Sequence, residues 1–132
     1  MKKEIITCII IAIFILVLNS ITQNYNNESV EDLQQQLEHL KTDILNTIEN
    51  NNDDENLIKE FNKLLENWKN RYEKLTYFIE HDELEKVETE FNYIKANLET
   101  KQYEQAVPNV ENSIFILEHI KQKFALQLKN IF

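Results

Sequence analysis

The feature that most constrains this chain is that its 132 residues include no glycine and a single proline, Pro108. Glycine supplies the positive φ angles of tight hairpin turns, so an all-β or α/β fold built on such turns is disfavoured. The same absence excludes glycine-rich phosphate loops, dinucleotide-binding fingerprints and the nucleophile elbow of hydrolases. We therefore expect an all-α protein.

The N-terminus carries a run of apolar residues from Ile5 to Leu18 that contains no charged side chain. Ile21 extends this run if the two intervening polar residues are tolerated near a membrane surface. A helix rises ~1.5 Å per residue, so the segment to Ile21 reaches about 25 Å, against a hydrocarbon core roughly 30 Å thick. We predict a single transmembrane helix that serves as a membrane anchor over residues 1–21.

Two alternatives to an uncleaved anchor remain open. A cleavable signal peptide needs small residues at alternate positions just after the apolar run. The stretch from Asn19 to Tyr25 offers no such pair, and Cys8 lies inside the run rather than after it, where a lipoprotein signal would place its cysteine. The sequence therefore favours the anchor over a cleaved signal, and over a buried helix of a soluble protein.

The distribution of basic residues predicts the orientation of this anchor. Lys2 and Lys3 precede the apolar run, and no lysine or arginine follows it until Lys41. Cytoplasmic flanks of membrane helices are enriched in basic residues. We therefore expect a single-pass protein of the cell membrane, with a cytoplasmic N-terminus and an extracytoplasmic C-terminal domain.

Charge and cysteine content limit the partners and the source of stability. The net charge is −9, so binding to nucleic acid, or to anionic lipid headgroups by charge, is disfavoured. The single cysteine, Cys8, lies in the apolar run, and no disulfide can form within the outer domain. That domain must be stabilised by the packing of its helices.

The rest of the chain divides into a polar stalk at residues 22–28 and a helical bundle domain at residues 29–132. Apolar residues recur every three or four positions from Val30, which predicts a helix from about Ser29 to Glu49, with Ser29 and Asp32 as a capping pair. The run of Asn and Asp at residues 50–54 predicts a break. The apolar positions of this first helix are Val30, Leu33, Leu37, Leu40 and Ile44, with Leu45 and Ile48 at its margin.

Three further helices follow, so the predicted fold is an antiparallel bundle of about four helices. The second begins with Asp53 as its N-cap candidate and extends to about Glu80. A corner at residues 81–83, with Asp82 as a cap, precedes the third helix, and residues 99–101 form the next corner. Pro108 predicts one of two features: a kink in the last helix, or a last helix that begins at Pro108 itself. The predicted core of the last helix reaches Leu128 and Ile131.

Three stretches from Trp68 onward stand out: residues 68–72 leading into 78–84, residues 117–120, and the C-terminal residues 126–132. They carry a resemblance to a family of short bacterial proteins, domain of unknown function 4363. It implies a helical domain behind an N-terminal membrane segment. It implies no known activity.

Trp68 and Tyr72 lie one helical turn apart and form the first candidate binding site. An aromatic pair can anchor a protein partner or a ligand ring. Aromatic residues at this spacing also pack in helical cores, and the core interpretation is the favoured one. Trp68 and Tyr72 are therefore candidates for binding a protein partner or a ligand, and the alternative is that they pack in the core.

His81, Asp82 and Glu85 form the second candidate site, at the start of the third helix. His81 and Glu85 are four residues apart and can share a helix face, as a weak metal or proton-sensing site needs. The favoured alternative is a histidine paired with a nearby carboxylate. His39 and His119 are expected to face solvent.

We expect no enzymatic activity, cofactor or resident metal. No His-Glu-x-x-His or Glu-x-x-His motif is present, and no serine has an activating context. The sequence favours a membrane-tethered helical bundle that interacts with a protein partner or serves a structural role. The alternative is a sensory or ligand-binding bundle that signals through a separate membrane protein.

Overall fold

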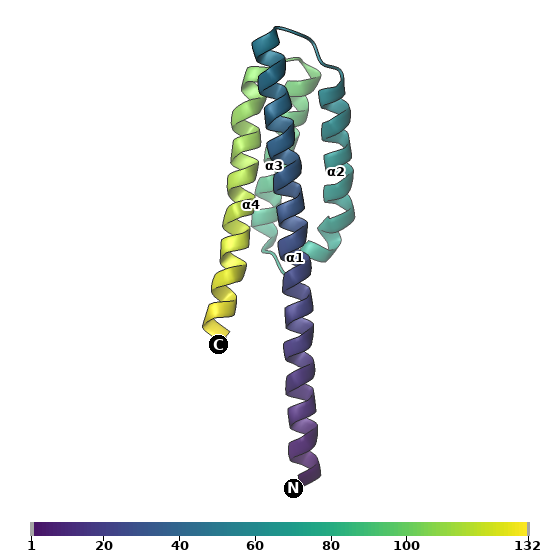
Figure 1. Cartoon of the computed structure of the whole chain (residues 1–132), viewed down its shortest axis with the longest axis vertical. Coiled ribbons are helices and arrows are strands. Elements are labelled where there is room, and N and C mark those ends of the chain that lie inside the picture. The colour runs from purple at the N-terminus through teal and green to yellow at the C-terminus, as the bar shows by residue number, and fades with distance from the viewer. Residues whose placement is uncertain (1, 132) are drawn as a thin grey trace.

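The computed structural model describes the backbone of residues 2–131 and their side chains except 127, 128, 130 and 131. Within these residues the chain forms four α-helices and is all-α, as predicted (Figure 1). The predicted core positions Leu128 and Ile131 lie outside the described side chains. The helices are α1 (Lys2–Asn50), α2 (Asn56–Leu75), α3 (His81–Glu99) and α4 (Tyr103–Ile131).

The helices run alternately up and down and pack as a four-helix bundle. Helix α1 packs against α2 and α4, and α3 packs against the same two helices. The connections are short, so consecutive helices are antiparallel neighbours. The N-terminal part of α1 projects beyond the bundle, past the corner that joins α2 to α3 (Figure 1).

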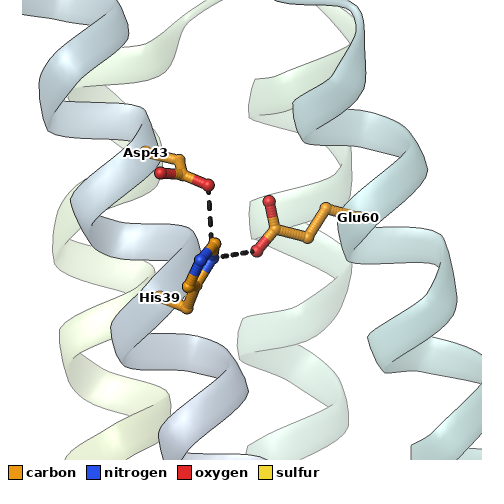
Figure 2. A group of neighbouring side chains, drawn as sticks. All are labelled: His39, Asp43 and Glu60. Atoms are coloured by element: carbon orange, nitrogen blue, oxygen red, sulfur yellow. Dashed lines mark hydrogen bonds and ion pairs between the residues drawn. The ribbon is translucent and has the colours of Figure 1, made fainter.

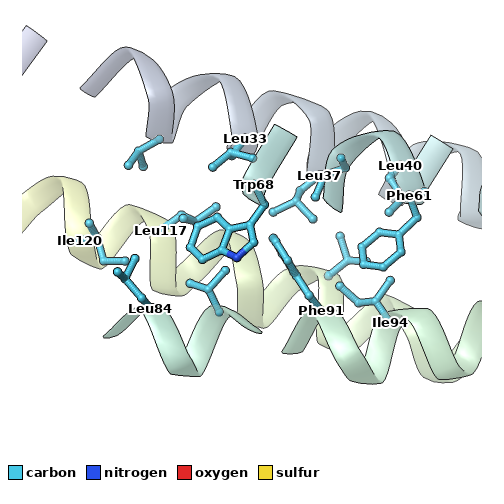
Figure 3. Packing of buried hydrophobic residues seen from close by; sticks show 14 of the residues in the cluster. Leu33, Leu37, Leu40, Phe61, Trp68, Leu84, Phe91, Ile94, Leu117 and Ile120 are labelled. Carbon is cyan, nitrogen blue, oxygen red and sulfur yellow. The ribbon is translucent and has the colours of Figure 1, made fainter. Parts of the chain in front are cut away.

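The core contains the apolar stripe of each helix. All five seam positions predicted for α1, from Val30 to Ile44, are buried, whereas the predicted margin residue Leu45 is exposed. Phe91 of α3 lies edge-to-face between Phe61 and Trp68 of α2, with ring centroids 5.9 and 5.5 Å apart. Burial of such side chains contributes about 1.5–3 kcal/mol each and supplies most of the driving force. Figure 3 shows these rings enclosed by aliphatic side chains of α1, α3 and α4.

The first helix differs from the prediction. A separate helix beginning at Ser29 is wrong, because α1 is continuous from Lys2 to Asn50 and the predicted stalk at residues 22–28 is helical. Ser29 is buried inside the helix and is not its cap. Asn and Ser weaken a helix only slightly, and packing against the bundle from Asn26 onward offsets that cost.

The predicted helix ends also need correction. Helix α2 ends at Leu75 rather than Glu80, so the corner is residues 76–80 and residues 81–83 form the first turn of α3. Asp82 is therefore inside α3 and is not its cap. At the start of α2 the Asp54 carboxylate, not Asp53, accepts the backbone N–H of Asn56 at 2.8 Å.

The last helix begins before its proline. Helix α4 starts at Tyr103, so the predicted start at Pro108 is wrong. Pro108 is the sixth residue of the helix and is exposed, where its ring meets solvent. The absent N–H costs one helical hydrogen bond without breaking the helix.

Candidate functional site

The aromatic pair predicted as a binding site extends from the core of the bundle to its rim. The Trp68 side chain is 2% exposed, and its ring contacts Tyr72 edge-to-face at 5.7 Å. The indole Nε1 donates a hydrogen bond to the Glu88 carboxylate of α3 at 3.3 Å. Burial is the main cause that raises the pKa of the Tyr72 phenol. In this arrangement Trp68 is a core residue, and only the half-buried Tyr72 reaches the rim.

The second predicted site lies on the surface at the start of α3. His81 Nε2 is 3.0 Å from the Glu85 carboxylate, and both side chains are largely exposed. Asp82 is exposed in the same turn. The structure brings His81 and Glu85 together as an ion pair when the histidine is protonated. Trp68 lies in the core, and His81 and Glu85 form a pair of their own on the surface.

A different cluster joins α1 to α2 and was missed from sequence. His39 Nδ1 lies 2.8 Å from the Glu60 carboxylate and 3.2 Å from the Asp43 carboxylate (Figure 2). The hydrogen bond with Glu60, followed by the charge of Asp43, raises the pKa of His39 above 6.5. His39 and Asp43 are four residues apart, which sequence can reveal. Glu60 comes from another helix, and only the packing register of α2 on α1 brings it there.

This cluster has the donor atoms of a metal site. One ligand atom each from His39, Asp43 and Glu60 lies within 4.8 Å of the other two. Imidazole nitrogens and carboxylate oxygens are ligands that Zn²⁺ accepts at about 2.0–2.2 Å. His39 is 71% exposed, so the same atoms are equally explained as a solvated ion pair. The arrangement can hold a proton between the three groups without any metal.

A partly buried ion pair joins α3 to α4. The Glu83 carboxylate accepts a hydrogen bond from Lys123 Nζ at 2.9 Å, and Lys86 lies 3.9 Å away. The hydrogen bond from Lys123 lowers the pKa of Glu83, against the effect of burial. Glu83 is thus charged and paired, and it holds the N-terminal end of α3 against the C-terminal half of α4.

A surface groove between α1 and α4 carries an exposed aromatic side chain. Lys121 of α4 pairs with Glu31 of α1 at 2.6 Å, and Gln34 donates to Glu118 at 3.1 Å. Phe115 lines this groove and is 72% exposed. The groove has a volume of about 870 Å³. An exposed aromatic ring among polar groups is the pattern that protein interfaces favour.

The N-terminal part of α1 does not pack against the other helices. Every large apolar side chain from Ile5 to Leu18 is exposed, and so is Ile21. Among residues 2–131, α1 is the one helix long and apolar enough to cross a membrane, and none of its most apolar stretch is buried. An N-terminal signal sequence has the same length and composition.

The comparisons with known proteins identify one family. The family described as Domain of unknown function (DUF4363) matches residues 20–131, which is all of the bundle and none of the apolar run. The resemblance inferred from residues 68–132 is thereby confirmed. No curated protein and no solved structure shows a significant match to this chain. The chain belongs to the DUF4363 family.

Proposed function

We propose that this protein is a membrane-tethered helical bundle, displayed outside the cytoplasm, that presents a binding surface to another protein. The observation that carries the proposal is that every large apolar side chain from Ile5 to Leu18, in the N-terminal part of α1, is exposed and none is covered by the bundle. Exposed apolar surface of this extent is unfavourable in water and favourable in a bilayer. The bundle has its own core, and that core contains no residue of this segment.

The orientation follows from charge. Lys2 and Lys3 flank the apolar segment on the N-terminal side, and the next lysine or arginine is Lys41, in the bundle part of α1. The positive-inside bias then places the bundle outside the cytoplasm. A retained anchor is favoured over a cleaved signal because no small-residue pair follows the segment.

The α1–α4 groove is the surface we assign to the protein partner. Phe115 is strongly exposed there while its neighbour Ile114 packs toward the core. We expect no catalytic activity, because Cys8 lies in the apolar segment and His39 and His81 pair with carboxylates on an open surface. The protein therefore acts by binding.

Site-specific photo-crosslinking in native membranes tests this function. A photo-reactive residue at Phe115 is expected to capture a defined protein, whereas the same residue at Lys69, exposed on α2 away from the groove, is not. Carbonate washing is expected to leave the protein in the membrane fraction. Equal crosslinking at Phe115 and Lys69, or release of the full chain by carbonate, would contradict the proposal.

A sensory role is the second candidate, and one observation favours it. Helix α1 runs without a break from the apolar segment into the bundle, so a shift of α1 in the bundle moves the membrane segment directly. The His39 cluster links α1 to α2 and offers a ligand site for such a shift. A rise in melting temperature with Zn²⁺ that is lost in H39A would support this role, since a ligand of the folded state stabilises it.

A further inference from the structure

We propose that the α2–α3 corner at residues 76–80 inserts Tyr77 and Phe78 into the surface of the same bilayer that holds α1. This inference rests on the proposed membrane anchor and adds a second contact to it. The bundle would then be docked against the lipid surface and not swing freely on α1. The two aromatic rings would contact the headgroups and the upper part of the acyl chains of the lipid.

The corner presents two aromatic rings to solvent on a fixed backbone. Tyr77 is 81% exposed and Phe78 is 45% exposed, with ring centroids 6.3 Å apart. Beside them Ile79 is buried, and its backbone N–H donates to the Leu75 carbonyl at 2.8 Å. The buried Ile79 thus holds the corner in place while its two aromatic neighbours remain outside the core.

The register of α2 on α1 places this corner near the end of the apolar segment. Toward the C-terminal end of α2, the Asn67 amide donates a hydrogen bond to the Gln36 side chain of α1 at 3.2 Å. Further along, Lys74 Nζ lies 5.3 Å from the centre of the Tyr25 ring. Between them Arg71 contacts Asp32 and the Ser29 carbonyl. The corner at Tyr77 therefore lies at the level of the low to mid twenties of α1.

That level fits the surface of a bilayer. At ~1.5 Å per residue, the low to mid twenties of α1 lie about 2–8 Å beyond Ile21, the last exposed apolar residue of the predicted anchor. The polar headgroup region on each side of the hydrocarbon core is about 5–8 Å thick. Figure 1 shows the corner at the end of the bundle from which α1 projects. Tyr77 and Phe78 are thereby positioned at the headgroup level of an inserted chain.

The chemistry of this end fits insertion of aromatic rings rather than attraction by charge. Aromatic residues, Tyr and Trp above all, are enriched at membrane–water interfaces, where an apolar body and a polar edge are both accommodated. Lys74 is offset by the exposed acids Glu73 and Glu80, so the corner carries no excess of positive charge. Docking should therefore not require anionic lipid.

Another exposed apolar side chain lies at the same end of the bundle. Lys121 of α4 pairs with Glu31 of α1, and Leu126 follows five residues further down α4. Leu126 is 60% exposed. The exposed apolar side chains at this end thus come from two separate parts of the chain, as a surface facing lipid would require.

Fluorescence quenching of the full chain in lipid vesicles tests the inference. The variant Y77W, reconstituted in phosphatidylcholine vesicles, is expected to show blue-shifted emission that brominated phosphatidylcholine quenches. The matched variant N52W places the probe in the α1–α2 connection at the opposite end, and its emission should remain solvent-like. The native Trp68 is buried in both proteins and supplies a constant background. Adding phosphatidylglycerol should leave the quenching unchanged.

The outcomes separate this inference from the proposed anchor. If the chain floats with the vesicles but Y77W is no more quenched than N52W, the anchor stands and the docked corner is wrong. If quenching appears with phosphatidylglycerol alone, attraction by charge replaces the insertion proposed here. If the chain does not float with the vesicles at all, both the anchor and the docked corner are contradicted.

Discussion

At the scale of single residues, Trp68 organises the centre of the core. It contacts Phe91 and Tyr72 edge-to-face and satisfies its indole N–H with Glu88, so a large apolar ring and its one polar atom are both accommodated. The periodic spacing of the sequence predicted the buried seam around it. The core interpretation of Trp68 was the favoured one and agrees with its burial. The helices that cover this face of α2 could not be predicted from the spacing alone.

Removing the indole should therefore destabilise the bundle strongly. We expect Trp68→Ala to lower the free energy of unfolding by about 3–5 kcal/mol, the range for large-to-small aromatic substitutions in cores. Trp68→Phe keeps most of the ring packing and should cost clearly less. Urea unfolding of the full chain in detergent, followed by circular dichroism, measures both. An alanine variant as stable as the native protein would show that the ring is not core.

His39 should make stability depend weakly on pH. Its pKa is raised above 6.5 in the folded protein, chiefly by the hydrogen bond with Glu60. The protonated form is thus favoured by folding, so its contribution is fully present below 6.5 and is lost as pH rises through the raised pKa. We expect the urea midpoint of the native protein to fall over this range by more than that of H39Q.

The two carboxylates should differ in their effect on this histidine. Glu60 is the larger cause of the raised pKa and Asp43 the smaller. In an NMR titration of the His39 ring, E60Q should therefore lower the pKa more than D43N does. Equal pKa values in the native protein and E60Q would contradict the geometry of the cluster.

At the scale of elements, the helix ends show how a chain without glycine closes its helices. Asn51 and Lys101 have φ angles of 54° and 57°, the left-handed conformation usually taken by glycine. After α1 the N–H of Asn51 bonds the Ile48 carbonyl and that of Asn52 bonds Thr47, both at 3.2 Å. This is the Schellman arrangement. Asparagine tolerates it better than most other residues.

A β-branched residue at this helix end should be costly. We expect Asn51→Val to destabilise the protein by about 1–2 kcal/mol, because its Cβ substituents clash in the left-handed conformation. Asn51→Gly should be as stable as the native protein or slightly more so. Thermal unfolding of the three proteins side by side measures the difference. A valine variant at least as stable as the glycine variant would contradict the positive φ angle.

Pro108 should weaken α4 at its second turn. Its ring nitrogen cannot donate to the Glu104 carbonyl, four residues earlier in the helix. We expect Pro108→Ala to restore that hydrogen bond and raise the free energy of unfolding by about 1–3 kcal/mol. The neighbouring variant Gln105→Ala, at another exposed position, should stay within about 0.5 kcal/mol of the native protein. An unchanged or lower stability of P108A would show that the helix depends on its proline.

Element types could be predicted from the sequence far better than their boundaries. The lack of glycine and the three-four spacing gave four helices in the right order. The continuity of α1 through residues 22–28 was missed because Asn26 and Ser29 resemble linker residues, and tertiary packing keeps them helical. The His39–Glu60 contact was missed for a related reason, since it depends on how α2 is aligned on α1.

At the scale of the whole molecule, α1 belongs to two environments. From Val30 to Ile44 its seam of apolar side chains is covered by the bundle, whereas those from Ile5 to Leu18 have no protein cover. The helix continues through both parts without interruption. Placing the exposed part in a bilayer leaves the bundle and its acidic surface on one side of the membrane. The claim central to this account is that the bundle lies outside the cytoplasm.

Cysteine accessibility in bacterial spheroplasts tests that claim most directly. In a Cys8→Ser background, which removes the one native cysteine, N52C places a thiol at the far end of the bundle and E4C places one before the apolar run. A membrane-impermeant maleimide is expected to label N52C in intact spheroplasts and E4C only after lysis. Protection of N52C until lysis, or recovery of the chain in the soluble fraction, would contradict the account.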